Sequence, residues 1–264
     1  MSSSQVVPSP PVNPGGEGTA LILDGVTRRF GGLMALAGVS VILPRGGRLA
    51  VIGPNGAGKT TLFRLISGEM RASDGTISLF GEDVSRASER ARARRGIART
   101  FQVSNLFVDL SVLDNVRIAA QAGTSRPRRF WWPVSERDAV TLRAKAMLER
   151  VGLGSRGADP VADLSHGEQR QLEIAMALVV EPRLLLLDEP AAGLSAAERK
   201  VLRRLLEELP EGLSLVLIEH DMSLALELVD HVLCLDNGVP LAYGTPDEIR
   251  ANPAVQAVYL GRRD

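Results

Sequence analysis

A glycine-rich segment of eight residues carries the clearest chemical pattern in the chain. It runs Gly53-Pro-Asn-Gly-Ala-Gly-Lys-Thr60 and follows a short apolar run at residues 49–52. Glycines let backbone N–H groups wrap a phosphate, and the positive end of a following helix adds to the attraction. Lys59 would add a point charge, and Thr60 would offer its hydroxyl to Mg²⁺. The predicted phosphate contacts are Gly53, Pro54, Asn55, Gly56, Ala57, Gly58, Lys59, Thr60 and Thr61.

A pair of carboxylates follows a second buried run. Four leucines at residues 184–187 precede Asp188 and Glu189. Alone, this pattern is typical of an ordinary strand end. Together with the glycine-rich loop it predicts that Asp188 holds Mg²⁺ through water and that Glu189 is the general base that polarises an attacking water.

Composition limits the classes of partner. Lys+Arg and Asp+Glu both number 31, so no net field favours nucleic acid or an anionic membrane. The single cysteine, Cys234, lies in an apolar stretch and predicts a buried thiol in a reducing compartment. No run approaches the roughly 18–20 apolar residues that cross a bilayer. We therefore expect a cytoplasmic protein whose membrane work needs another chain.

The elements that must position these residues indicate an α/β fold. Residues 1–18 predict a disordered tail, and residues 19–264 a single domain. Charged, helix-favouring sequence between about 103 and 163 predicts an inserted helical subdomain. Thr245-Pro-Asp-Glu248 predicts a short final helix. The expected strands are antiparallel at residues 21–26, 39–43 and 76–80, and buried or parallel at 49–52, 184–187 and 214–218.

A second motif follows the insert. Leu164-Ser-His-Gly-Glu168 contains the Ser165 and Glu168 pair of a capping box. The helix that it starts has an apolar stripe formed by Leu172, Ala175, Leu178 and Val179. The motif resembles the signature of ATP-binding cassette (ABC) proteins, and the other motifs occur in the expected order from about residue 21 to residue 261. This resemblance implies a P-loop NTPase core with an antiparallel β subdomain and an inserted α-helical subdomain.

The resemblance implies further roles for single residues. Gln102 is similar to the glutamine that links the two subdomains, senses the γ-phosphate and contacts Mg²⁺. Glu189 resembles the catalytic glutamate, and His220 resembles the switch histidine. Phe30 is similar to the aromatic residue that stacks on adenine, with simple core packing as the alternative.

The signature implies a site shared between subunits. Ser165, Gly167 and Glu168 would face the γ-phosphate of ATP held by a second ATPase subunit, identical or related, with Mg²⁺ as the metal. Two departures stand out. His166 replaces the more usual glycine of the signature, and Ser195 stands where the family often has aspartate.

Several local sequences narrow the resemblance. They are similar to ATPase subunits of branched-chain amino acid importers, although urea and amide importers share much of the pattern and lipopolysaccharide-export ATPases share part of it. The implied partners are two transmembrane permease subunits and, indirectly, a periplasmic or extracellular solute-binding protein, with the ATPase at the cytoplasmic face of the membrane. A permease helix would dock in a groove beside Gln102. The matching segments are residues 30–33, 99–102, 187–194, 219–222, 244–246, 252–253 and 259–261.

Other function classes remain to be compared. ABC proteins that act on nucleic acid or ribosomes usually carry paired cassettes, coiled coils or zinc-binding cysteines, and this sequence has none of them. A regulatory protein with a degenerate nucleotide site is disfavoured because the residues expected to bind and hydrolyse ATP are all in place, namely Lys59, Thr60, Gln102, Ser165, Asp188, Glu189 and His220. The aromatic stretch around Phe130, Trp131 and Trp132 favours packing within the insert over contact with a membrane surface or nucleic acid.

Overall fold

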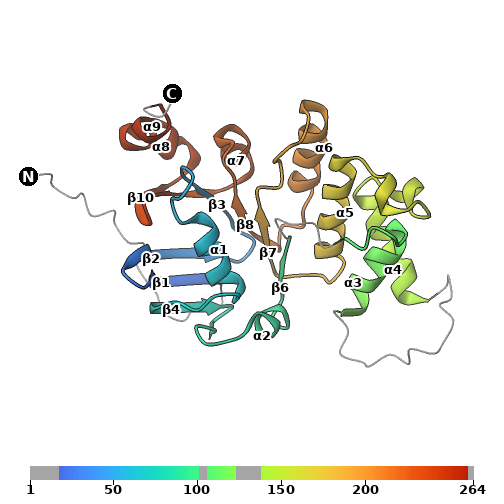
Figure 1. The fold of residues 1–264 in the computed structure, drawn as a ribbon, viewed down its shortest axis with the longest axis horizontal. Helices are drawn as coiled ribbons and strands as arrows, with labels where there is room; N and C mark the ends of the chain where they lie inside the picture. The colour runs from blue at the N-terminus through green and yellow to red at the C-terminus, as the bar shows by residue number, and fades with distance from the viewer. Residues whose placement is uncertain (1–17, 101–105, 123–137, 261–264) are drawn as a thin grey trace, which may run out of the picture.

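Figure 1 shows two β-sheets with helices beside them and a further group of helices at one end of the molecule. The computed structural model describes residues 18–100, 106–122 and 138–260. Within these ranges no helix is both long and apolar enough to cross a membrane.

The smaller sheet is antiparallel and contains β1 (Thr19–Phe30), β2 (Leu33–Pro44), β4 (Asp74–Leu79) and β5 (Glu82–Asp83), in the order β2-β1-β4-β5. β1 and β2 extend beyond the predicted strands, because alternate positions face solvent and accept charged residues such as Arg29. Val26 and Val39 pair across the two strands and are fully buried. The expected antiparallel strands therefore form a sheet of their own.

The larger sheet has the order β10-β9-β3-β8-β7-β6. Five strands are parallel, and β10 runs antiparallel at the edge. The predictions for β3, β7 and β8 are confirmed, whereas β6 and the β9–β10 hairpin were missed. β6 is too short to show a pattern, with only three residues. The strands are β3 (Arg48–Ile52), β6 (Ile97–Arg99), β7 (Leu184–Asp188), β8 (Ser214–Ile218), β9 (His231–Asp236) and β10 (Val239–Gly244).

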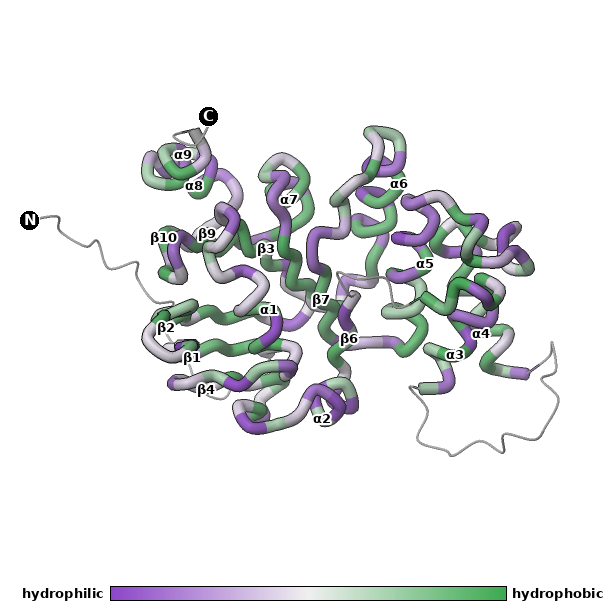
Figure 2. The backbone as a smooth tube through the Cα atoms, in the orientation of Figure 1, coloured by the Kyte–Doolittle hydropathy of each residue, from purple (hydrophilic) through white to green (hydrophobic). Residues whose placement is uncertain are grey.

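This sheet separates two hydrophobic cores. Successive side chains of a strand point to opposite faces. Leu49 and Val51 of β3 therefore join a core with helix α1 (Lys59–Ser67) and the antiparallel sheet. Ala50 and Ile52 join the other core, which contains α5 (His166–Leu178), α6 (Ala196–Glu207) and α7 (Met222–Leu228). The central strands are hydrophobic along their length (Figure 2), as burial on both faces requires.

The helical insert packs against α5. α3 (Val112–Ala122) and α4 (Ala139–Arg150) bury one side each, and the four-residue apolar stripe predicted on α5 is buried against them. Two 3₁₀ turns, at Gly154–Arg156 and Val161–Asp163, return the chain to α5. Within the described residues, Ser111 and Pro160 form an isolated β-bridge. The aromatic stretch at residues 126–133 lies outside the described residues, and the boundaries 103–163 stay a prediction.

The chain finishes in two helices rather than the one predicted. α8 (Pro246–Ala251) begins with the predicted Thr245 and Glu248 capping box. α9 (Pro253–Leu260) follows at once because Asn252 ends α8 and its side chain accepts hydrogen bonds from Ala254 N and Val255 N. Asn252 therefore serves both helices, which the sequence pattern of either one did not reveal.

A buried arginine holds the far end of α1. Arg92, on the short helix α2 (Glu89–Ala93), is fully buried. Its guanidinium donates to the carbonyl oxygens of Leu65 and Ile66 at the C-terminal end of α1, at 2.6 and 2.9 Å. It also donates to the carbonyls of Val84 and Ala87. Burial lowers the pKa of Arg92 to about 10, and the carbonyl dipoles compensate the charge.

Candidate functional site

The glycine-rich loop joins β3 to α1, as predicted, and its backbone tolerates no side chain at two positions. Gly53 has a φ of 147°, and an added Cβ would lie 2.2 Å from the carbonyl oxygen of Leu235. Gly58 has a φ of 98°, and its Cβ would lie 2.8 Å from the carbonyl oxygen of Ala35. The loop thus depends on glycine for both its conformation and its close packing.

Lys59 is buried at the first turn of α1. Its Nζ donates to the carbonyl oxygens of Gly53 and Pro54, at 2.7 and 3.0 Å. Burial lowers the pKa of Lys59, while the nearby carboxylates of Glu189 and Asp188 partly offset that effect. The ammonium group is therefore folded over the concave side of the loop, held by backbone oxygens.

Asp188 and Glu189 end β7 beside this loop. Asp188 is 3% exposed, and burial, reinforced by Glu189, raises its pKa to about 6. Its Oδ1 is buried with no hydrogen-bond partner. Glu189 has a φ of 47°, an unusual conformation for a non-glycine residue, and its amide donates to Ile218 O. Such strain at a carboxylate is common at functional sites.

His220 follows β8, where the chain leaves the sheet. Its Nδ1 lies 3.9 Å from Glu189 Oε2 and 3.9 Å from Glu219 Oε2. Glu219 is fully buried, its pKa is raised by burial, and it accepts a hydrogen bond from Ala191 N at 3.0 Å. This hydrogen bond holds the backbone of the residues that follow Glu189 in place. No role was predicted for Glu219 from the sequence.

A cavity of about 500 Å³ opens over the loop. Lys59, Thr60, Thr61 and Glu189 all line it. Phe30 does not, although it is 43% exposed and has Arg28 over its ring at 4.5 Å. Several lining residues were not predicted from the sequence, because they come from the β1–β2 and β9–β10 hairpins, which lie beside the loop only in the folded chain. These residues are Leu33, Met34, Ala35, Asn237 and Gly238.

The signature residues begin α5, with the predicted capping box in place. Ser165 Oγ accepts from Glu168 N, and Ser165 N donates to the Glu168 carboxylate. A separate small cavity is lined by Ser165, Gly167 and Glu168 and shares no residue with the cavity over the glycine-rich loop. α1 and α5 belong to opposite cores, so the helices that begin at the loop and at the signature cover different faces of the larger sheet.

The two departures from the usual pattern lie close together. His166 Nε2 is 3.3 Å from the carbonyl oxygen of Ala192, in the segment that leads to Ser195. Ser195 is the N-cap of α6 and forms a capping box with Glu198. Ser195 therefore has a structural role that does not depend on a charge.

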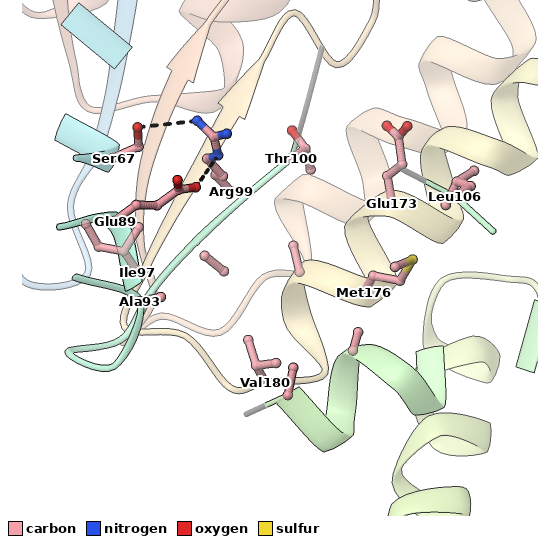
Figure 3. Close-up of a pocket in the computed structure, with 14 residues that line it drawn as sticks. Ser67, Glu89, Ala93, Ile97, Arg99, Thr100, Leu106, Glu173, Met176 and Val180 are labelled. Carbon is pink, nitrogen blue, oxygen red and sulfur yellow. Dashed lines mark hydrogen bonds and ion pairs between the residues drawn. The ribbon is translucent and has the colours of Figure 1, made fainter. Parts of the chain in front are cut away.

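A third cavity, of about 300 Å³, lies where the sheet core meets the insert (Figure 3). Its walls are mostly apolar and come from α2, β6, α3 and α5. Arg99 contacts Ser67 at 3.3 Å and Glu89 at 3.3 Å. Glu173 Oε1 and Thr100 Oγ1, which belong to two other residues of the lining, are buried without a hydrogen-bond partner. Gln102 itself lies outside the described residues, two positions beyond Thr100.

Comparisons with known proteins agree with this geometry. Residues 36–192 match the family model described as "ABC transporter", and residues 239–264 match one described as "Branched-chain amino acid ATP-binding cassette transporter". The high-affinity branched-chain amino acid transport ATP-binding proteins BraF of Pseudomonas aeruginosa and LivG of Escherichia coli are each 39% identical to the chain. Each alignment covers 91% of this chain and 97% of the relative. The crystal structure of MJ1267, an ATP-binding cassette of an ABC transporter in its ADP conformation, superimposes with a TM-score of 0.83 at 28% identity and covers 92% of this chain and 99% of that one.

Proposed function

Because the chain belongs to the ABC transporter family, as an ATP-binding subunit, we propose that it energises the import of branched-chain amino acids across the cytoplasmic membrane. Members of this family hydrolyse ATP in the service of transport. The observation that carries the proposal is the convergence of Lys59, Thr60 and Glu189 on one cavity. The match of residues 239–264 and the names of the relatives support the solute class.

The residues present fit Mg²⁺ as the accompanying metal. Asp188 Oδ1 is a buried acceptor without a hydrogen-bond donor, and the pKa of Asp188 is raised because burial and the charge of Glu189 outweigh the attraction of Lys59 and Arg64. Thr60, Asp188 and Gln102 would hold the ion, with phosphate oxygens completing its shell. When bound, the ion neutralises charge on the outer phosphates.

The chain's own residues divide the remaining work. Lys59 exchanges its two carbonyl partners for phosphate oxygens, and the amides of the loop bind the same anion. Glu189 polarises the attacking water, and His220 donates a hydrogen bond that orients the γ-phosphate. Glu219 holds the following segment through Ala191 N, which keeps Glu189 in its strained conformation.

The complete site needs a second ATPase subunit. The loop and the signature of one chain lie on opposite cores, so Ser165, Gly167 and Glu168 serve the nucleotide of the partner subunit. The N-terminus of a 13-residue helix is a suitable binding site for the γ-phosphate. ATP then joins two subunits, and hydrolysis releases them.

The groove between core and insert is the proposed docking site for a cytoplasmic helix of the permease. Its mostly apolar walls match the apolar face of an amphipathic helix. Replacing Met176, which lines the groove, with glutamate should abolish copurification of the permease while the isolated chain still hydrolyses ATP. Leu142→Glu, at an exposed position on α4, is the matched control. Intact assembly and transport in Met176→Glu would exclude this docking site.

The whole proposal is tested in membranes that contain the copurified permease. Leucine uptake and ATP turnover should both fall by about 10²-fold or more in Glu189→Gln, since the general base is lost. Glu181→Gln changes another glutamate with a positive φ and should have no effect. Urea uptake is measured in parallel. Uptake of urea in place of leucine would overturn the solute class and leave the ATPase assignment standing.

A further inference from the structure

A carboxylate of the same chain occupies the N-terminus of the signature helix. Glu198 Oε1 accepts a hydrogen bond from Gly167 N at 3.0 Å. The side chain of Glu198 also packs closely against Gly167: a Cβ added to Gly167 would lie 2.4 Å from Glu198 Oε1 and 2.6 Å from Glu198 Cγ. Because glycine has no side chain, position 167 provides the room that the Glu198 carboxylate occupies.

The other oxygen anchors Glu198 at the start of α6. Glu198 Oε2 accepts from Ser195 N at 2.8 Å and from Ser195 Oγ at 2.7 Å. The hydrogen bonds from Ser195 and Gly167, with the nearby His166, hold the pKa of Glu198 below its usual value. The group is therefore an anion at neutral pH, bound between the first turns of two helices.

From these contacts we propose that Glu198 is an internal anion that holds the Gly167 amide until the γ-phosphate of the partner subunit's ATP replaces it. This inference rests on the proposed function, in which Gly167 serves a phosphate in trans. Two anions cannot share one amide at close range without strong repulsion. Dimerisation with ATP must therefore displace Glu198 from Gly167. The free energy of this displacement raises the ATP concentration that two chains need in order to dimerise.

The position of Ser195 gives this exchange a route to the catalytic segment. Ser195 lies six residues after Glu189 and holds the oxygen of Glu198 that does not contact Gly167. Its neutral hydroxyl adds no second negative charge beside Glu198. A shift of Glu198 away from Gly167 is consequently transmitted through the Ser195 bonds to the start of α6, which follows the Glu189 segment.

A substitution that keeps shape and removes charge tests the proposal. In a Glu189→Gln background, which traps bound ATP, Glu198→Gln should reduce the ATP concentration for half-maximal dimerisation about fivefold. That factor corresponds to replacing a charge-assisted hydrogen bond with a neutral one. Glu248→Gln is the matched control, because Glu248 forms an equivalent capping box at α8 without touching the signature. An unchanged or higher ATP requirement in the Glu198 variant would overturn the proposal.

A readout on the nucleotide-free chain separates this inference from the proposed function. Among the three histidines only His166 precedes a glycine, so carbonyl-¹³C histidine with ¹⁵N glycine gives a single coupled signal, that of the Gly167 amide. Its proton resonance should move upfield in Glu198→Gln and stay in place in Glu248→Gln. If it does not move, Glu198 does not hold the amide. If it moves but no variant dimerises with ATP, the shared site of the proposed function fails, and with it the exchange at Gly167.

Discussion

Asp188 should make the nucleotide-free protein less stable than it would be with a neutral side chain. Burial raises the pKa of this carboxyl from 3.8 to about 6. Two pKa units at 1.36 kcal/mol each correspond to about 3 kcal/mol of differential interaction. Asp188→Asn should therefore increase the free energy of unfolding by about 3 kcal/mol at pH 8, which raises Tm by about 6–12 °C, while nucleotide turnover is lost.

The pH dependence has a definite sign. The pKa of Asp188 is raised in the folded state, so the unfolded state binds fewer protons between the two pKa values, and stability from this group increases as pH falls. The destabilisation caused by ionised Asp188 is fully present above about pH 6 and absent below pH 3.8. The advantage of Asp188→Asn should accordingly shrink to about half at pH 5.

Urea denaturation with a metal chelator and without nucleotide measures this advantage. Asp109→Asn, at an exposed position, controls for a general effect of losing an aspartate. A variant no more stable than its parent at pH 8, or an advantage that grows at pH 5, would refute the view that Asp188 is an uncompensated buried anion.

Two further substitutions test the supports of the loop. Arg92→Met removes a buried guanidinium with four carbonyl partners and should lower the free energy of unfolding by about 3–5 kcal/mol in urea; the exposed Arg94→Met should change it little. Gly53→Ala forces a strained φ costing about 1–3 kcal/mol and a clash with Leu235 O, so fluorescent nucleotide binding should be lost. Gly212→Ala, where the added Cβ meets nothing within 4 Å, should bind normally.

The local parts of the site were predictable from sequence because local chemistry specifies them. The glycine-rich loop needs a strand before it and a helix after it, and both are present. The capping box at Ser165 is a pattern of four consecutive residues, and it forms as predicted. Leu184–Asp188 is apolar enough to identify a strand buried on both faces.

Contacts between distant segments were not predictable in this way. Asn237 and Gly238 reach the cavity only because β9 lies beside β3 in the sheet. The bond from Gly167 to Glu198 joins two helix starts 31 residues apart. The full burial of Arg92 is also unexpected from sequence, since arginine is seldom fully buried. The backbone carbonyl oxygens that surround its guanidinium make this burial possible.

Arg92 also determines what nucleotide does to the fold. The C-terminal end of α1 is held by the buried cation of Arg92, whereas the N-terminal end has no side-chain cap and begins with a lysine bound to backbone oxygens of the preceding loop. Without nucleotide, only the negative, C-terminal end of the α1 dipole is therefore compensated by a charged group. A bound polyphosphate supplies the missing counter-charge, so ligand binding completes the electrostatic balance of a core element. The melting temperature of this protein should consequently report the nucleotide concentration around it.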